Sequence, residues 1–381
     1  MALDEISERL QVSDFPTLGM AANYDLRRHK FESLANDGSH EMRADVRRWV
    51  GNPSDFGGCN PINGHIIALT MPMIKPERVK IAGYIYECWF LYSWDLTTTL
   101  TRVDGFFHDD ILEGTNEGVS DTDAFGLGTA DQDAKARDGR KQIQAKMMYR
   151  LETTDKACAK HLQKVWSNML VTTIQHKSRD FETLEEYIDF RIRDCGALFG
   201  EGVMLFGMGL ALTEKDREDV ASTIYPCYAA LGLTNDYYSF DREWEEAQRS
   251  GEAKFSNAVR LFMDWQSTDA ATAKEVVRKA IIEYEREFLE LREKFVKANP
   301  EAERLHQFLE AMVYQISGHV VWSLNCPRYN PSFRYDPNSG VENQLLAERR
   351  GKSSSKKPSA LIEDINEKSH LASESGPTMI A

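Results

Sequence analysis

The sequence predicts an all-α fold. From residue 76 onward, apolar residues recur at the spacing of amphipathic helices, whereas the alternating patterns of strands are sparse. Capping residues mark several of the helix ends that this spacing implies. Hydrophobic residues make up 42% of the 381 residues, which is enough to bury a large core. No internal repeat is detected, so we expect one folded domain.

The stretch before about residue 60 is mixed, with a helical pattern near residues 42–50 and a loop, SDFGGCNPINGH, at residues 54–65. Further along, Thr213 followed by Asp216 resembles the start of a capped helix. Asn299 and Pro300 are expected to end one helix and begin the next. The long helices are expected over residues 141–177, 183–212, 213–248, 268–298 and 301–324.

The composition changes near Tyr335. Residues 336–381 contain few aromatic residues and many lysines, serines and glutamates, including the string GKSSSKKPSA. Such a segment cannot bury enough apolar surface to form a core of its own. We therefore expect a folded domain over residues 1–335 and a disordered polar tail or linker over residues 336–381.

Charge and composition restrict the partners and the location of the protein. The formal net charge of −14 argues against nucleic acid and against anionic membrane surfaces as partners. The most apolar window, residues 195–212, is interrupted by Glu201, so we expect a buried helix and no membrane span. The six cysteines form no CxxC pair, and the N-terminus lacks the features of a signal peptide. We expect reduced thiols and a cytoplasmic protein.

An acidic segment follows two aromatic residues in the stretch FFHDDILEGTNEG, residues 106–118. On a helix, Asp109 and Glu113 point the same way because they are four positions apart, and Asp110 flanks them. Like charges at that spacing destabilise a helix unless a cation lies between them. Oxygen ligands favour a hard ion, Mg²⁺ before Ca²⁺ or Zn²⁺. Taken alone, such a segment is more often a solvated helix face.

A second set of oxygen donors lies in the stretch LTNDYYSFDREWEE, residues 233–246. Asn235, Ser239 and Glu243 stack along one helix face over about 12 Å. Asn and Ser are mediocre helix formers, so their place in an apolar helix is costly unless they bind something. A buried polar network between helices is the alternative. Two oxygen-rich faces together suggest a cluster of Mg²⁺ ions that would attract diphosphate.

Basic residues that could complete an anion site occur in three places. Arg191 is followed three residues later by Asp194, which can hold its guanidinium. Arg328 and Tyr329 come directly after the last long helix, and Arg242 lies within the second oxygen-rich stretch. The planar guanidinium suits phosphate. Any one of these arginines alone is more often part of a surface ion pair.

Four motifs in this order resemble those of class I terpene synthases. DDILE resembles the family's aspartate-rich motif, and NDYYSFDRE resembles its Asn, Ser and Glu at four-residue steps. RIRDCG is similar to the diphosphate-sensing arginine with its linker aspartate and helix break, and PRY is similar to the Arg–Tyr pair that closes the site. The strings DLRRHKF, LTMPMIKPERVKIAGY and SGHVVWSLNCPRYN resemble the cyclase domain of fungal chimeric, fusicoccadiene-synthase-like di- and sesterterpene synthases.

The resemblance implies a helical bundle around a central apolar cavity and three Mg²⁺ ions. The implied metal ligands are Asp109, Asp110, Glu113, Asn235, Ser239 and Glu243. The residues implied to bind diphosphate are Arg191, Asp194, Asn235, Ser239, Arg242, Arg328 and Tyr329. The implied catalytic residues are Asp109, Arg191, Asn235, Arg328 and Tyr329. The expected cavity residues are Phe90, Phe107, Cys195, Gly196, Phe199 and Trp322.

The implied reaction is ionisation of a linear isoprenyl diphosphate and cyclisation of the carbocation. Geranylgeranyl diphosphate is the expected substrate and a polycyclic diterpene the expected product, with geranylfarnesyl diphosphate and a sesterterpene as the alternative. The chain has no second aspartate-rich motif, so a separate or formerly fused prenyltransferase would supply the substrate. A homo-oligomer is compatible with these features.

One stretch departs from the family's pattern. Residues 91–106, LYSWDLTTTLTRVDGF, separate an aromatic-rich helix from the acidic motif. Removing them would leave the uninterrupted helix IAGYIYECWFFHDDILE, and their threonines are poor helix formers. We interpret the stretch as a private insertion or a retained intron that would displace Asp109 from the metal cluster.

Three other functions fit parts of the sequence. A prenyl diphosphate synthase uses the same metal chemistry, but it should have a second DDxxD where this chain has Asn235, Ser239 and Glu243. An HD phosphohydrolase could use His108 and Asp109, but the upstream histidines lack convincing spacing. A non-catalytic, all-α partner-binding module would leave the acidic residues solvated.

Overall fold

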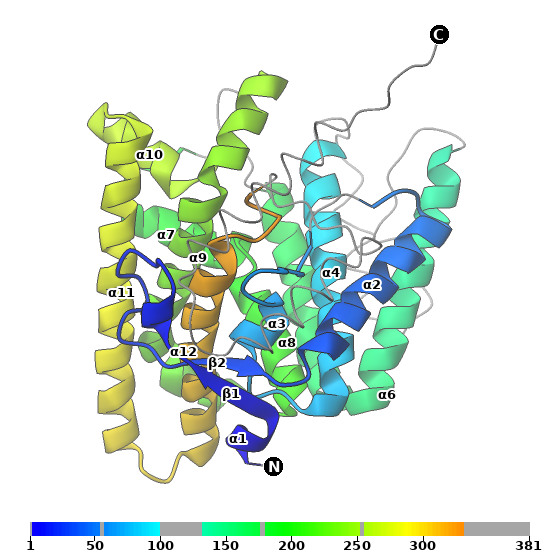
Figure 1. The fold of residues 1–381 in the computed structure, drawn as a ribbon, viewed down its shortest axis with the longest axis horizontal. Helices are drawn as coiled ribbons and strands as arrows, with labels where there is room; N and C mark the ends of the chain where they lie inside the picture. Colours follow the sequence, from blue (N-terminus) through cyan, green and yellow to red (C-terminus); the bar gives the residue numbers. More distant parts are fainter. Residues whose placement is uncertain (1, 54–56, 100–131, 176–179, 252–254, 331–381) are drawn as a thin grey trace, which may run out of the picture.

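The computed structural model describes residues 2–53, 57–99, 132–175, 180–251 and 255–330, and it confirms the all-α prediction (Figure 1). Helices account for most of this part of the chain. In order along the chain, the elements are α1 (Leu3–Ile6), β1 (Ser7–Leu10), the 3-10 helix η1 (Val12–Asp14), β2 (Leu26–His29), α2 (Glu32–Trp49), α3 (Ile66–Thr70), α4 (Pro76–Thr99), α6 (Gln132–Gln175), α7 (Leu184–Asp194), α8 (Ala197–Met208), α9 (Glu214–Ser250), α10 (Ala258–Gln266), α11 (Ala270–Ala298) and α12 (Glu303–Ser323).

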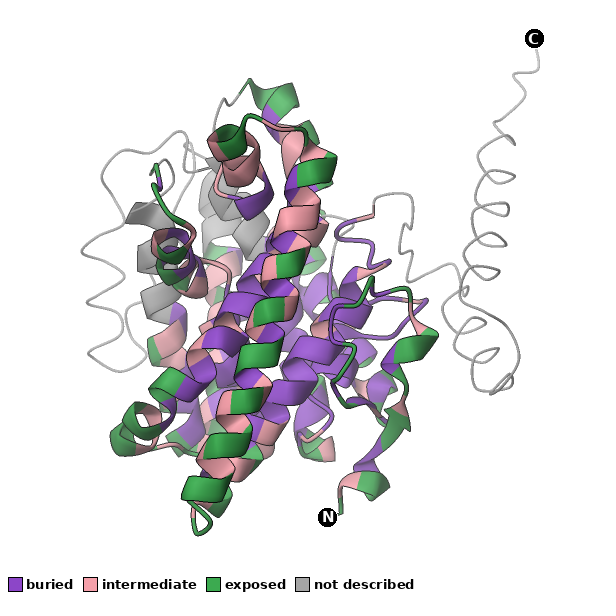
Figure 2. Cartoon of the chain, turned by 90° about the vertical axis from the view of Figure 1, so that its left-hand side faces the viewer, coloured by how far each residue is buried: buried purple, intermediate pink, exposed green. Residues whose placement is uncertain are grey.

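The helices pack around α8 and α12, which lie in the middle of the molecule (Figure 1). α9 packs against α11 on one side, α2 packs against α4 on the other, and α12 contacts both α3 and α9. The helix surfaces that face the interior are buried and those that face outward are exposed (Figure 2). The apolar faces of helices from both halves of the chain therefore share one core.

Two short strands belong to the parts of the fold that sequence reasoning did not predict. β1 and β2 form a two-stranded antiparallel sheet in which Ser7 pairs with His29 and Leu10 pairs with Leu26. Each strand has four residues and carries charged side chains, so the alternating pattern that marks a strand is too short to detect.

Capping groups set the helix ends that the sequence predicted. At the start of α9, Thr213 Oγ1 accepts a hydrogen bond from Asp216 N at 3.1 Å, and Thr213 N donates to Asp216 Oδ2 at 2.8 Å. Asn299 is the C-cap of α11, and its side chain donates to Phe295 O at 2.9 Å. The predictions of a capped start at residue 213 and of a helix end at residue 299 are confirmed.

The prediction of a single helix over residues 183–212 is wrong, because the helix is interrupted between α7 and α8. Gly196 has φ 78°, in the left-handed region that favours glycine. A Cβ atom at this position would lie 2.5 Å from Trp89 Cζ2. The break lies at the Cys195–Gly196 step, where the family resemblance implied one.

Several other helices differ from the predictions; α6, for example, begins at Gln132, ahead of the expected residue 141. α2 begins at Glu32, ahead of the helix expected at residues 42–50, and α10 was not predicted. α4 continues through Thr99, so the threonines of residues 97–99 do not end the helix. α8, which contains the apolar window, is buried, and its Glu201 accepts a hydrogen bond from Arg217 Nη1 at 2.8 Å. Among the described residues, no helix is both long and apolar enough to cross a membrane.

Candidate active site

The predicted oxygen donors of α9 lie along one helix face. α9 has no break between Glu214 and Ser250, so Asn235, Ser239 and Glu243 are separated by four residues, slightly more than one turn each. Ser239 Oγ is buried and has no hydrogen-bond partner within the described part of the chain. A buried polar group without a partner costs about 1–3 kcal/mol. A ligand on this face would satisfy the hydroxyl.

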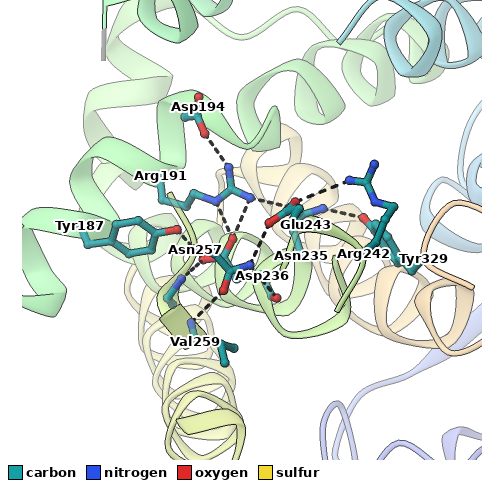
Figure 3. Close-up of polar contacts among 11 residues, drawn as sticks. Tyr187, Arg191, Asp194, Asn235, Asp236, Arg242, Glu243, Asn257, Val259 and Tyr329 are labelled. Atoms are coloured by element: carbon teal, nitrogen blue, oxygen red, sulfur yellow. Dashed lines mark hydrogen bonds and ion pairs between the residues drawn. The ribbon is translucent and has the colours of Figure 1, made fainter. Parts of the chain in front are cut away.

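Asn235 connects two of the residues implied to bind diphosphate (Figure 3). Its Oδ1 accepts a hydrogen bond from Arg191 Nη2 at 2.6 Å. Its Nδ2 donates to Tyr329 Oη at 2.5 Å. The three residues come from α7, from α9 and from the segment after α12, so tertiary packing alone brings them together.

The guanidinium of Arg191 is held on all three of its nitrogen atoms (Figure 3). Nη1 donates to Asp194 Oδ2 at 2.6 Å, the partner that the sequence predicted. Nε donates to Asp236 Oδ1 at 2.8 Å, and Nη2 is engaged by Asn235. Burial alone would lower the pKa of Arg191, but Asp236, Tyr187 and Asp194 together outweigh this effect and raise that pKa. The arginine is therefore charged and preoriented.

Asp236 is a site residue that sequence reasoning missed. Besides Arg191, it accepts hydrogen bonds from Tyr187 Oη at 2.6 Å and from Ala258 N at 3.0 Å. Burial raises the pKa of Asp236 to about 6, although the charge of Arg191 opposes the shift. Its position next to Asn235 turns it about 100° away from the metal-binding face and toward α7 and α10.

Asn257, which precedes α10, was also missed. Its Oδ1 accepts from Val259 N at 2.9 Å and so caps α10. Its Nδ2 donates to Glu243 Oε2 at 3.0 Å and to the main-chain oxygen of Asp236 at 3.0 Å. The amide thus fixes Glu243 from a neighbouring helix. No spacing in the sequence distinguishes Asn257 from an ordinary capping residue.

Two further arginines concentrate positive charge beside this cluster. The Arg328 guanidinium lies 4.7 Å from the centre of the Phe90 ring, and its Nη1 lies 3.5 Å from Phe90 O. Burial and, to a smaller extent, the charge of Arg242 lower the pKa of Arg328 to about 10. Arg242 Nη2 lies 3.6 Å from Glu243 Oε1. An anion next to Arg242 and Arg328 would offset their repulsion.

Aromatic side chains adjoin the polar cluster. The rings of Phe90 and Trp322 are stacked at 5.6 Å, and Trp322 meets Tyr329 edge-on at 5.5 Å. Phe199 lies 5.5 Å from Trp89 and is fully buried. Phe90 and Trp322 are at most 2% exposed. The expected cavity residues on α4, α8 and α12 therefore form one apolar cluster beside the charged groups.

The break between α7 and α8 adjoins the same cluster. Cys195 ends α7, and its N donates to Arg191 O at 2.8 Å. Burial raises the pKa of the half-buried Cys195 thiol to about 11, so the thiol is protonated at neutral pH. Gly196 lies against Trp89. Cys195 and Gly196 therefore lie between Arg191 and the aromatic side chain of Trp89.

Part of the predicted site lies outside the described residues. This part comprises the acidic motif, with Asp109, Asp110 and Glu113, and the expected cavity residue Phe107. Residues 100–106 of the interpreted insertion also fall there. These assignments stay predictions.

Comparison with known proteins decides the family. The model of terpene synthase family 2, C-terminal metal binding, matches residues 95–287. Terpene cyclase ATR13 from Stachybotrys chlorohalonatus is 94% identical over 381 residues, which is 100% of both chains. The chain belongs to the terpene synthase family. It is therefore an enzyme of the terpene cyclase type, which excludes the phosphohydrolase and the non-catalytic module.

Further relatives of this synthase are larger proteins. Variediene synthase from Aspergillus brasiliensis is 39% identical over 332 residues, which is 86% of this chain and 46% of that protein. Fusicoccadiene synthase from Phomopsis amygdali is 31% identical over 337 residues, which is 87% of this chain and 46% of that protein. The resemblance to fusicoccadiene-type synthases is confirmed, and the chain spans about half the length of these two relatives.

A solved structure confirms the fold class. Aristolochene synthase from Penicillium roqueforti superimposes with a TM-score of 0.56, covering 76% of this chain and 94% of that one. The two sequences are 18% identical, so this likeness shows the fold of class I terpene synthases and nothing finer.

The donor set on α9 fits the metal binding by which the family is described. A carbonyl, a hydroxyl and a carboxylate are hard oxygen ligands. Ser239 Oγ has both lone pairs available among the described residues, and Asn235 Oδ1 retains one beside its bond from Arg191. No group of three or more His, Cys, Asp or Glu side chains in the described ranges could hold a metal ion. In this part of the synthase, the face of α9 that carries Asn235, Ser239 and Glu243 is therefore the candidate metal-binding site.

Proposed function

We propose that the protein is a Mg²⁺-dependent terpene cyclase that ionises geranylgeranyl diphosphate and cyclises the carbocation to a polycyclic diterpene hydrocarbon. One observation carries the proposal. The amide of Asn235, the first of three oxygen-donor residues on α9, is bonded to both Arg191 and Tyr329. Metal-binding and anion-binding groups of the expected types therefore converge at one point.

In this proposal, Asn235, Ser239 and Glu243 hold Mg²⁺ on one side, and Asp109, Asp110 and Glu113 hold it on the other. Mg²⁺ takes few protein ligands and completes its shell with water and phosphate oxygens, and the resemblance implies three ions. Bound Mg²⁺ would supply charge stabilisation for the departing diphosphate. The unpartnered hydroxyl of Ser239 supports this assignment.

The diphosphate would be bound by Arg191, Arg242, Arg328 and Tyr329. Arg191 is preoriented by Asp194 and Asp236, so little reorganisation is needed when the anion arrives. The lowered pKa of Arg328, caused by burial and by Arg242, returns toward its ordinary value when an anion neutralises the pair. Donors that are fixed before the reaction stabilise the charge that develops on the leaving group.

The carbocation would be surrounded by the aromatic cluster. Phe90, Phe199 and Trp322 are the described members, and Phe107 is the expected further one. Aromatic faces attract a cation by about 0.5–2 kcal/mol each. The stacking of Arg328 on Phe90 supports this role, because that ring already faces a positive charge. Cys195 and Gly196 would border the same space at the helix break.

The length of the substrate is proposed from the relatives. A bifunctional type I diterpene synthase from Aspergillus flavipes is 31% identical over 328 residues. A bifunctional sesterterpene synthase from Talaromyces wortmannii, at 29% over 327 residues, supports geranylfarnesyl diphosphate as the second candidate. Since the match covers only 42% and 41% of these larger proteins, we propose that a separate or formerly fused prenyltransferase supplies the substrate.

The test is incubation of the purified protein with farnesyl, geranylgeranyl and geranylfarnesyl diphosphates in the presence of Mg²⁺. Gas chromatography should detect a cyclic C20 hydrocarbon, and chelation of the metal should abolish both this product and the release of diphosphate. A C25 hydrocarbon as the main product would favour the sesterterpene alternative. A longer diphosphate formed from isopentenyl diphosphate and an allylic partner would instead identify a prenyl diphosphate synthase.

A further inference from the structure

The loop between α2 and α3 is joined to the C-terminal end of α12. Asn60 Nδ2 donates to Trp322 O at 2.9 Å. Asn63 Nδ2 donates to Val321 O at 2.7 Å. In return, Trp322 Nε1 donates to Gly58 O at 3.0 Å. Residues about 260 positions apart are thus connected by three hydrogen bonds.

The hydrogen bonds from Asn60 and Asn63 involve main-chain carbonyl groups in the last turn of α12. The last four carbonyl groups of an α-helix have no partner within the helix. α12 ends at Ser323, so the carbonyls of Val321 and Trp322 are two of these four groups. Asn60 and Asn63 are both buried, and each supplies a side-chain amide to one of the carbonyls. The loop is therefore a C-terminal cap contributed from a distant part of the sequence.

The cap is itself rigidly held. Asn60 Oδ1 accepts from Ile62 N at 2.9 Å and from Asn63 N at 3.1 Å, so both ends of its amide are used. Gly58 N donates to Glu87 Oε2 at 2.8 Å, and Glu87 is a fully buried residue of α4. Hydrogen bonds therefore run from α4 through the loop to the end of α12.

The residues that follow this capped end belong to the proposed diphosphate site. Only residues 324–327 separate α12 from Arg328 and Tyr329. Tyr329 accepts the hydrogen bond from Asn235, and the Trp322 ring lies between those of Phe90 and Tyr329. With so short a connection, the place where α12 ends determines where Arg328 and Tyr329 lie.

We propose that Asn60 and Asn63 are positioning residues of the cyclase, because they cap α12 and thereby hold Arg328 and Tyr329 against the diphosphate. This inference rests on the proposed function. Within the described part of the chain, the side-chain hydrogen bonds of both asparagines go to the loop itself and to residues 321–325, and not to the residues that would bind the metal or the diphosphate. Their contribution is made through the helix end, and the part of it that acts through Arg328 should disappear when Arg328 is absent.

A double-mutant cycle tests the proposal. The affinity for inorganic diphosphate in the presence of Mg²⁺ is measured by titration calorimetry for the wild type, N63A, R328A and the double variant. We expect N63A to weaken binding about tenfold in the wild-type background and less than about twofold in the R328A background, since coupled residues are not additive. Thermal unfolding of each variant is measured in parallel.

Asn299→Ala is the matched control. Asn299 also donates a side-chain hydrogen bond to the last turn of a helix, at the end of α11. It should lower thermal stability less than N63A, because Asn299 is exposed, and leave diphosphate affinity unchanged in both backgrounds. If N63A does not fold, Asn63→Leu is used, because its side chain has a similar size and branching but is uncharged and cannot donate.

The outcomes distinguish a failure of the positioning role from a failure of the proposed cyclase function. Wild-type affinity in N63A, or an equal loss with and without Arg328, would overturn the positioning role while leaving the proposed function intact. A wild-type protein that binds no diphosphate with Mg²⁺ would overturn the proposed function, and the positioning role with it.

Discussion

Arg191 Nη2 donates a hydrogen bond of 2.6 Å to Asn235 Oδ1, although the two residues are 44 positions apart in the chain. The same amide donates to Tyr329. One side chain of the proposed metal set therefore contacts two members of the proposed diphosphate set. Movement of either anion-binding residue when diphosphate binds would be transmitted to the metal-binding face of α9.

Asn235→Ala removes a proposed metal ligand and both of these hydrogen bonds. We expect kcat to fall by roughly 10²–10³-fold, as when a preorganised group that stabilises developing charge is lost. KM should change much less, because the lost interactions act mainly in the transition state. Steady-state kinetics of diphosphate release measures both constants. A variant with raised KM and wild-type kcat would show that Asn235 only contributes to ground-state binding.

Ser239→Ala tests whether the Ser239 hydroxyl binds the metal or only stabilises the fold. Because Ser239 Oγ has no partner in the described part of the chain, its removal should leave the free energy of unfolding unchanged or slightly higher. The Mg²⁺ concentration for half-maximal activity should rise about tenfold, equivalent to roughly 1.4 kcal/mol. Activity is titrated with Mg²⁺, and urea unfolding is followed by circular dichroism.

Ser323→Ala is the control for this change, since Ser323 Oγ is another buried hydroxyl without a partner among the described residues. It should match S239A in stability and retain the wild-type Mg²⁺ dependence. A marked loss of stability in S239A would instead indicate that the hydroxyl belongs to a structural network.

Gly196→Ala tests the break between α7 and α8. The positive φ of 78° costs a residue with a Cβ about 1–2 kcal/mol, and the new methyl group would also meet Trp89 at 2.5 Å. Gly251 provides the matched control, because its φ is 74° and, among the described residues, no atom lies within 4 Å of a Cβ added there. Urea unfolding should show a larger loss for G196A than for G251A. Equal losses would mean that the indole moves aside without cost.

Glu285→Gln tests a buried carboxyl outside the site. Glu285 Oε2 accepts a hydrogen bond from Ala21 N at 2.7 Å, and burial raises the pKa of Glu285 from 4.5 to about 8. The protonated form is thus favoured by folding, and its contribution is complete below pH 4.5 and lost as pH rises toward 8. The free energy of unfolding should fall over this range by at most about 1.4 kcal/mol per pH unit.

The glutamine variant should show a weaker pH dependence, as measured by urea unfolding at several pH values between 5 and 8. Glu287→Gln is the control, because Glu287 is an exposed residue of the same helix and should leave the wild-type profile unchanged. An unaltered profile in E285Q would assign the pH dependence to other groups.

Local sequence patterns predicted the parts of the site that depend on one helix. The four-residue spacing of Asn235, Ser239 and Glu243 is a property of α9 alone, and α9 forms as expected. Asp236 and Asn257 were missed for the same physical reason. Their partners lie on other helices, and nothing in the adjacent residues indicates which helices those are.

By itself, the sequence determined the helical class, the capped start of α9, the end of α11 and the order of the four motifs, because each depends on residues within a few turns. Only the tertiary structure decided that Arg191 and Tyr329 meet at Asn235, and that a loop near residue 60 caps α12. These contacts depend on how the apolar faces of distant helices pack, which is a property of the whole core.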